Sequence, residues 1–174
     1  VPLVVVRAHR GEDAGFDRVR ERPFLEGGPG EGLFLKSLSN CYQKVIALDN
    51  SKDMLNKARA FSLGEGLENI EFVLSDTGEY KQQYIKGDQS SVDAVVMNMV
   101  LHHVPAPSQI FFDVYAFLKP GGTLVICDLA RHHQEWAKEN CGDLWLGFET
   151  KELLSWAQRA GFKEENNAYI GLRN

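Results

Sequence analysis

A glycine-rich run at residues 27–32 is the first segment whose residue types could do chemistry. It consists of Gly-Gly-Pro-Gly-Glu-Gly and lies where a strand could turn into a helix. Glycines let a ligand approach the backbone closely, and the N-terminus of a following helix favours negative charge. The third glycine of a dinucleotide fingerprint is replaced by Leu33, and the chain has no triphosphate-binding Gly-x-x-x-x-Gly-Lys-Ser/Thr motif. The run therefore favours another kind of ligand, and a tight turn without a ligand is the alternative.

Three further polar positions follow apolar runs along the chain. Asp49 lies 17 residues after Gly32, where a carboxylate can accept hydrogen bonds from both hydroxyls of a ribose. The alternative is an acid that complements the dipole of the next helix. Asp76, followed by Thr77, could bind an adenine amino group or could be an ordinary turn residue. Asn98 could contact the ligand or cap a strand, and several such polar ends in order indicate a ligand site.

Two adjacent histidines, His102 and His103, come shortly after Asn98. A histidine beside a reacting group can act as a general base or can orient the group that is being modified. The alternative is that one ring lies in the core and the other in a loop. We expect no metal site here, because adjacent side chains do not share a face of a strand or a helix.

Apolar, β-branched runs alternate with helical patterns over most of the chain. This alternation predicts βαβ units, and hence an α/β fold of the Rossmann-like, doubly wound type: a mostly parallel sheet with helices on both faces. Ligands of such sheets bind at the carboxyl ends of the strands, where the polar positions above fall. The expected strands span 23–27, 44–49, 70–74, 92–97, 123–127 and 167–172, and the expected helices span 33–38, 52–62, 107–118 and 150–160.

The first 22 residues do not fit this alternation. They form an N-terminal segment of uncertain structure, with a possible helix near 13–19, and we place the domain at residues 23–174. Only six apolar residues precede Arg7, too few for a signal peptide or a membrane span, so we expect a cytoplasmic protein without membrane contact.

Charge and cysteine content narrow the function classes. The formal net charge of −5 argues against direct nucleic-acid binding by this domain. The three cysteines are widely spaced and form no Cys-x-x-Cys pair, which argues against zinc or redox chemistry. A small-molecule ligand and a possible homodimer fit these properties.

The motifs resemble those of class I S-adenosylmethionine (SAM)-dependent methyltransferases of the methyltransferase-11 type. Residues 26–32 resemble the acid-x-Gly-x-Gly-x-Gly motif of the family, residues 45–49 its second motif, residues 75–77 its third, and residues 93–103 its fourth. The run Leu-Lys-Pro-Gly-Gly at 118–122 resembles the turn before the fifth strand. The resemblance extends from about residue 24 to residue 162.

This resemblance implies that the chain transfers a methyl group from SAM, leaving S-adenosylhomocysteine, to an acceptor that we expect to be a small molecule. His103 or His102 would face the acceptor. The residues that would hold the cofactor are Glu26, Gly28, Gly30, Asp49, Asn50, Met54, Asp76, Thr77 and Asn98.

Residues 128–136 and 142–148 resemble, within this family, the methyltransferase domain fused to arsenic-responsive-type winged-helix regulators. A non-catalytic SAM-binding or SAM-sensing module of a transcriptional regulator is therefore an alternative function. An NAD-dependent oxidoreductase is a further alternative, but it would need the glycine that Leu33 replaces. The family also closes its sheet with an antiparallel hairpin, and we expect this chain to lack its last strand. That strand would lie inside the sheet, so its absence would leave unpaired backbone groups that need some partner.

Overall fold

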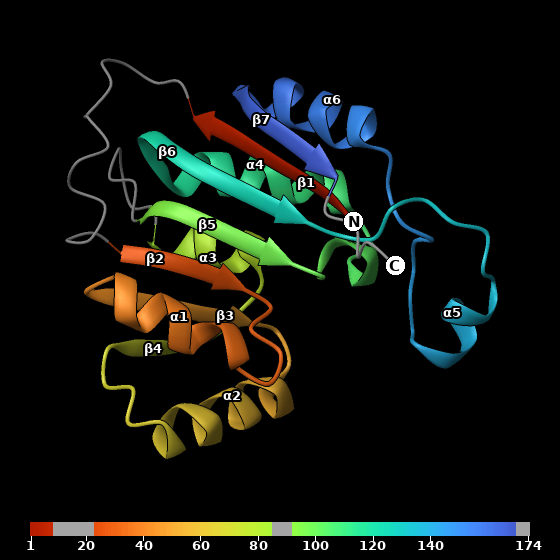
Figure 1. Cartoon of the computed structure of the whole chain (residues 1–174). Helices are drawn as coiled ribbons and strands as arrows, with labels where there is room; N and C mark the ends of the chain where they lie inside the picture. The colour runs from red at the N-terminus through yellow and green to blue at the C-terminus, as the bar shows by residue number, and fades with distance from the viewer. Residues whose placement is uncertain (9–22, 85–91, 170–174) are drawn as a thin grey trace.

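The computed structural model describes residues 1–8, 23–84 and 92–169, and seven strands of these residues form one sheet (Figure 1). Along the sheet the order is β4-β3-β2-β5-β6-β1-β7. Neighbours from β4 to β6 pair in parallel, whereas β1 is antiparallel to both β6 and β7. The strands are β1 (Pro2–Ala8), β2 (Pro23–Gly27), β3 (Lys44–Asp49), β4 (Ile70–Leu74), β5 (Val92–Asn98), β6 (Leu118–Cys127) and β7 (Phe162–Tyr169).

Helices cover both faces of this sheet, as a Rossmann-like α/β fold requires. One face packs against α1 and α2 around a core that includes Leu35, Val45 and Ala58. The other packs against α3, α4 and α6 around a larger core that includes Phe111 and Leu153. The helices are α1 (Leu33–Cys41), α2 (Lys52–Gly64), α3 (Thr77–Tyr84), α4 (Pro107–Phe117), α5 (Trp136–Asn140) and α6 (Thr150–Ala160), and a short 3₁₀ turn spans Leu101–His103.

Local chemistry explains where these helices begin and end. The hydroxyl of Ser51 accepts a hydrogen bond from the backbone N–H of Met54 at 3.3 Å, which caps α2. Gly161 ends α6 in the left-handed conformation, with φ of 104°. No helix of the described residues is long and apolar enough to cross a membrane.

The strand β1 was not predicted, and it occupies the position that we expected to be empty. It lies between β6 and β7, and Val4, Val6 and Ala8 are fully buried on one of its faces. Its backbone pairs with residues 123–127 of β6 and with residues 162–169 of β7. The backbone groups that were expected to need a partner inside the sheet therefore have one, because residues from the start of the chain pair with them.

Other elements also differ from prediction: the helices α3 and α5 were not predicted, and two strands begin earlier than expected. The last strand begins at Phe162 rather than Asn167, because the chain turns directly into it after Gly161. The strand β6 begins at Leu118 rather than Thr123, and its register with β5 shifts around Asp93. The possible helix near 13–19 lies outside the described residues, as do positions 170–172 of the predicted last strand.

Candidate cofactor and acceptor site

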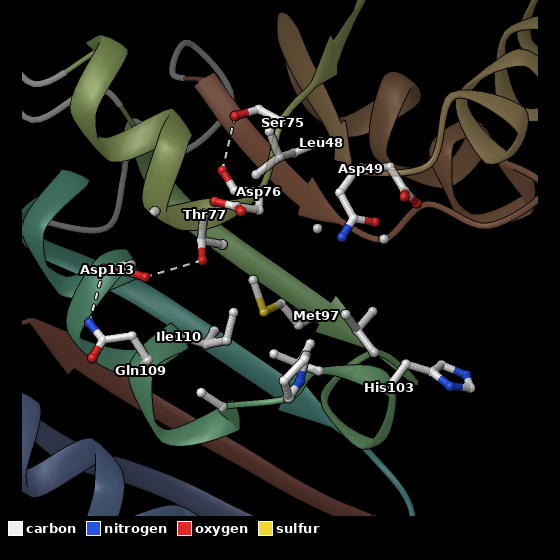
Figure 2. A pocket seen from close by; sticks show the side chains of 18 of the residues that line it. Leu48, Asp49, Ser75, Asp76, Thr77, Met97, His103, Gln109, Ile110 and Asp113 are labelled. Atoms are coloured by element: carbon white, nitrogen blue, oxygen red, sulfur yellow. Dashed lines mark hydrogen bonds between the residues drawn. The ribbon is translucent and has the colours of Figure 1, made fainter. Parts of the chain in front are cut away.

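A pocket of about 690 Å³ lies at the carboxyl ends of β2, β3, β4 and β5. This is the edge at which parallel α/β sheets bind ligands. Figure 2 shows that Asp76, Thr77 and Asp113 lie together on one side of the pocket, with His103 on the other and Met97 between them. Seven of the nine predicted cofactor residues line it: Gly28, Gly30, Asp49, Asn50, Met54, Asp76 and Thr77.

The glycine turn forms one wall of the pocket and needs its glycines for two different reasons. Gly28 has φ of 70°, and a Cβ there would lie 2.5 Å from Cγ2 of Val100, so a side chain would clash. Gly30 has φ of 55°, but the space where its Cβ would project is open, and the residue lines the pocket. The turn therefore leaves room for a ligand at Gly30 while packing tightly at Gly28.

Asp49 ends β3 beside this turn with part of its hydrogen-bonding capacity unused. Its Oδ1 atom accepts a hydrogen bond from the backbone N–H of Ser51 at 2.8 Å. Burial raises the pKa of the Asp49 carboxyl, and backbone N–H groups of Ser51 and Asn50 partly oppose this rise. A carboxylate accepts several hydrogen bonds, so the side chain can both hold the turn and receive ribose hydroxyls.

Asp76 has a similar double role at the end of β4. Its Oδ1 atom accepts a hydrogen bond from the backbone N–H of Glu79 at 2.8 Å, which caps α3. Behind it, Thr77 Oγ1 donates to Asp113 Oδ2 at 3.4 Å, and Asp113 Oδ1 also accepts from Lys81 at 3.0 Å and from Gln109 at 3.2 Å. Of this polar end of the pocket, only Asp76 and Thr77 were predicted.

Glu26 and Asn98 are the two predicted cofactor residues that do not line the pocket. Asn98 is exposed at the end of β5. Glu26 is buried beneath the glycine turn, and its Oε2 atom has no hydrogen-bond partner among the described residues. Burial raises the pKa of Glu26 to about 7.

The two histidines separate into one pocket residue and one buried residue. His103 lines the pocket, whereas His102 is 4% exposed and lies behind it. The Nδ1 atom of His102 is 2.7 Å from Oδ1 of Asp128, which also accepts backbone hydrogen bonds. Of the predicted pair, only His103 is placed to meet an acceptor directly.

The sequence analysis missed the stretch after β5 that forms the floor of the pocket. Met99, Val100 and residues 104–106 line it, followed by Gln109 and Ile110 of α4. Met99 has φ of 59°, a conformation that is uncommon for residues other than glycine and that is often found at functional sites. An apolar run followed by a proline-initiated helix could have indicated this floor, but its sequence carries no distinctive ligand chemistry.

The aromatic residues Trp136, Trp145 and Phe148 do not line the pocket. Phe148 is fully buried in the core, and Trp145 packs against that core while its Nε1 donates to the carbonyl of Val104 at 2.9 Å. Trp136 is 54% exposed. Trp145 and Phe148 are therefore packing residues.

Comparison with known proteins agrees with this fold and pocket. A family model described as a methyltransferase domain matches residues 20–161. The chain therefore belongs to the methyltransferase-domain family. SAM-dependent methyltransferases from Aquifex aeolicus and Mesorhizobium loti have similar structures, with TM-scores of 0.65 and 0.67, identities of 23% and 21%, and coverage of 82% and 85% of this chain and 73% and 77% of theirs.

Two curated relatives show how the sequence similarity is distributed. The chain is 27% identical to the ubiquinone biosynthesis O-methyltransferase of Proteus mirabilis over 164 residues, which cover 85% of this chain and 63% of that protein. It is 32% identical to the arsenite methyltransferase of Halobacterium salinarum over 87 residues, which cover 50% of this chain and 21% of that protein. The chain thus spans less than two thirds of the length of these relatives.

The cofactor of this family is SAM, and two features of the pocket fit it. The open space beside Gly30 admits a ligand close to the backbone, where a side chain would intrude. The carboxylates of Asp49 and Asp76 lie at the same pocket, as a ribose and an adenine amino group require. The methyltransferase fold and this pocket together indicate an enzyme.

Proposed function

We propose that the chain transfers a methyl group from SAM to a small-molecule acceptor. The observation that carries the proposal is that Gly30, Asp49, Asp76 and His103 line a single pocket, although they lie on four separate segments of the chain. A pocket of about 690 Å³ falls in the size range of small-molecule sites. The names of the relatives, which include a quinone-pathway enzyme and an arsenite enzyme, support a small acceptor but not a particular one.

When bound, SAM supplies a methyl group attached to a positively charged sulfur, which makes the methyl carbon electrophilic without further activation. The protein therefore has to align the acceptor and exclude water, rather than activate the methyl group. Gly28 and Gly30 shape the turn, Asp49 receives the ribose hydroxyls, and Asp76 with Thr77 holds the adenine. His103 lies on the opposite side of the pocket from Asp76 and Thr77, where it would face the acceptor.

Calorimetric titration with S-adenosylhomocysteine tests the cofactor site. We expect Asp49→Ala to weaken binding at least about tenfold, because two ribose hydroxyls lose a charged acceptor. Asp53→Ala is the matched control: Asp53 is an exposed acid in the first turn of α2, and we expect unchanged binding. Equal affinities of Asp49→Ala and the wild type would overturn the ribose assignment.

The second candidate function is a SAM-sensing module of a transcriptional regulator. It is supported by the resemblance of residues 128–136 and 142–148 to methyltransferase domains fused to winged-helix regulators. Incubation with labelled SAM and a cell extract separates the two functions. An enzyme transfers the label to an acceptor, and a sensor binds SAM without transferring it.

A further inference from the structure

Beside the acceptor end of the pocket lies a cluster of two histidines and two aspartates. The 3₁₀ turn at Leu101–His103 brings the rings of His102 and His103 to a centroid distance of 4.0 Å. Both rings approach Oδ1 of Asp143, with 3.9 Å to His102 Nε2 and 3.8 Å to His103 Nδ1. Adjacent side chains do not share a face of a strand or an α-helix, but this backbone is a 3₁₀ turn, so both rings can approach one carboxylate.

The contacts of Asp128 determine which nitrogen of His102 is free. Its carboxylate accepts backbone N–H groups of Val100, Leu101 and Leu129 at 2.8 to 3.0 Å, so it acts as an acceptor. The His102 Nδ1 atom, 2.7 Å from Asp128 Oδ1, must then carry the proton. In the neutral ring the lone pair lies on Nε2, which is the atom that faces Asp143.

A carboxylate that accepts a hydrogen bond from a histidine ring commonly supports that histidine as a metal ligand. Histidines that bind metals donate their second ring N–H to a carboxylate, which fixes the ring and raises its basicity. Asp128 would provide this support, since it is fully buried and held by three backbone bonds.

Asp143 is itself an unusual partner, because it is 6% exposed and yet stands too far from both rings for a hydrogen bond. Burying a carboxylate is costly unless a positive charge accompanies it. Its position is fixed by the segment that follows: the backbone N–H groups of Leu144 and Trp145 both donate to the carbonyl of His102, at 2.8 and 3.1 Å. His103 Nδ1 also lies 3.4 Å from the carbonyl oxygen of Gly142, and it offers a lone pair only in the tautomer that gives up this contact. In that tautomer, three electron-pair donors surround the space between His102, His103 and Asp143.

We propose that His102 Nε2, His103 Nδ1 and Asp143 bind one divalent first-row transition ion, with Asp128 as a positioning residue. The three ligand atoms lie within 4.8 Å of one another. Bonds of about 2.1 Å to such an ion would bring neighbouring ligand atoms to roughly 3.2 to 3.5 Å. The two separations from Asp143 would then close by about half an ångström, and the widest separation, up to 4.8 Å, by about one ångström or more. His103, half exposed, is free enough to make this movement. Imidazole and carboxylate ligands suit zinc and its neighbours rather than calcium or magnesium.

Three protein ligands leave at least one position of the ion open, as catalytic zinc sites do. Because His103 also lines the pocket, this position would lie beside the acceptor and could hold an acceptor oxygen. This role rests on the proposed function, whereas the binding of the ion does not.

Titration of the metal-free protein with Co²⁺, followed by its visible absorption, tests the site directly. We expect one Co²⁺ per chain in the wild type, at least about tenfold weaker binding in His103→Ala and Asp143→Asn, and a loss of about 10-fold or more in Asp128→Asn. The control is the double variant His132→Ala/His133→Ala, which removes the other adjacent histidine pair. We expect it to bind Co²⁺ as the wild type does.

Each result can be separated from a folding defect and from the cofactor site. Asp143→Asn changes a residue that does not line the pocket, and its circular dichroism and affinity for S-adenosylhomocysteine should match the wild type. Failure of the wild type to bind Co²⁺, or loss of binding only in the His132/His133 variant, would overturn the metal site. Binding of S-adenosylhomocysteine without Co²⁺ would leave the proposed function standing, and Co²⁺ binding without S-adenosylhomocysteine would leave the metal site standing.

Discussion

Glu26 is buried next to the glycine turn that lines the pocket, and one of its carboxylate oxygens has no partner among the described residues. Its pKa is raised from 4.5 to about 7 because burial penalises the charged form. The folded protein therefore holds a proton that the unfolded chain releases at lower pH. Stability due to this group is fully present below pH 4.5 and is lost as the pH rises through 7.

We accordingly predict that Glu26→Gln removes a pH dependence. Between pH 4.5 and 7 the free energy of unfolding of the wild type should fall relative to the variant by up to about 3 kcal/mol. Chemical denaturation at several pH values without ligand measures this difference. Parallel stability curves for the two proteins would show that the Glu26 carboxyl is not desolvated in the folded state.

In the histidine pair, the residue type suggests a chemical role, and the local backbone geometry determines where each ring lies. The sequence predicts that His102 or His103 acts as a general base or orients the acceptor. Only the 3₁₀ turn determines that His102 is buried against Asp128 and that His103 lines the pocket. Asp143 could not be assigned to this site from the sequence, because it lies 40 residues after His103 in a segment without a periodic pattern.

At the scale of elements, the strand β1 closes the sheet between β6 and β7. Its alternation is strict: Val4, Val6 and Ala8 are fully buried, whereas Leu3 and Val5 are partly exposed on the opposite face. The strand β1 pairs with β6 along one edge and with β7 along the other, so within the sheet of the described residues β6 and β7 are joined only through it. Its removal would leave two strands with unpaired backbone groups, which is costly inside a sheet.

We predict that Val6→Asp destabilises the protein by more than about 4 kcal/mol, because an unpaired charge would be buried in the larger core. Val5→Asp is the matched control, with the same change on the partly exposed face of the same strand, and it should cost far less. Urea denaturation of both variants gives the comparison. Similar losses would mean that β1 does not sit in the sheet with this register.

Most elements of the fold could be predicted because their sequence signals are local. The run Val45–Leu48 is continuously apolar and ends in an acid, as a strand buried on both faces should. The strand β7 was misplaced because it lies at an edge of the sheet, where polar residues such as Lys163 and Asn167 are tolerated. The place of β1 could not be predicted, since nothing in an apolar run at the start of a chain specifies neighbours more than 100 residues away.

The candidate site was predictable to a similar extent. Glycines and acids at strand ends carry their own chemistry, so Gly30, Asp49 and Asp76 were found from spacing alone. Asn98 was expected at the pocket by the same logic, but the chain turns at Met99 and leaves the Asn98 side chain exposed. Asp113 was missed because its role depends on α4 packing beside α3, which no local pattern reveals.

At the scale of the whole molecule, the pocket lies between two sets of segments that follow different strands of the sheet. The turn after β2 and the ends of β3 and β4 form one side, and the segment after β5 with the start of α4 forms the other. A ligand that contacts both sides binds only the folded chain, so it must shift the unfolding equilibrium by mass action. The molecule should therefore report cofactor binding through its global stability.

We predict that S-adenosylhomocysteine at about 100 times its dissociation constant stabilises the protein by about 2.7 kcal/mol, equivalent to a rise in melting temperature of roughly 5 to 10 °C. Differential scanning fluorimetry over a ligand series measures this rise. Gly30→Ala should abolish most of it, because the new methyl group enters the open space where the ligand approaches the backbone. Gly66→Ala is the matched control, since Gly66 has φ of 68°, has equally open surroundings and does not line the pocket.

Without ligand, both glycine variants should lose about 1 to 2 kcal/mol, the ordinary cost of placing a side chain in the left-handed region. With ligand, Gly66→Ala should show the full wild-type increase in melting temperature, whereas Gly30→Ala should show little of it. Equal ligand-induced increases in the two variants would show that the cofactor does not approach the turn at Gly30. An increase produced by NAD instead of S-adenosylhomocysteine would favour a dinucleotide site, despite Leu33 at the position of the third glycine.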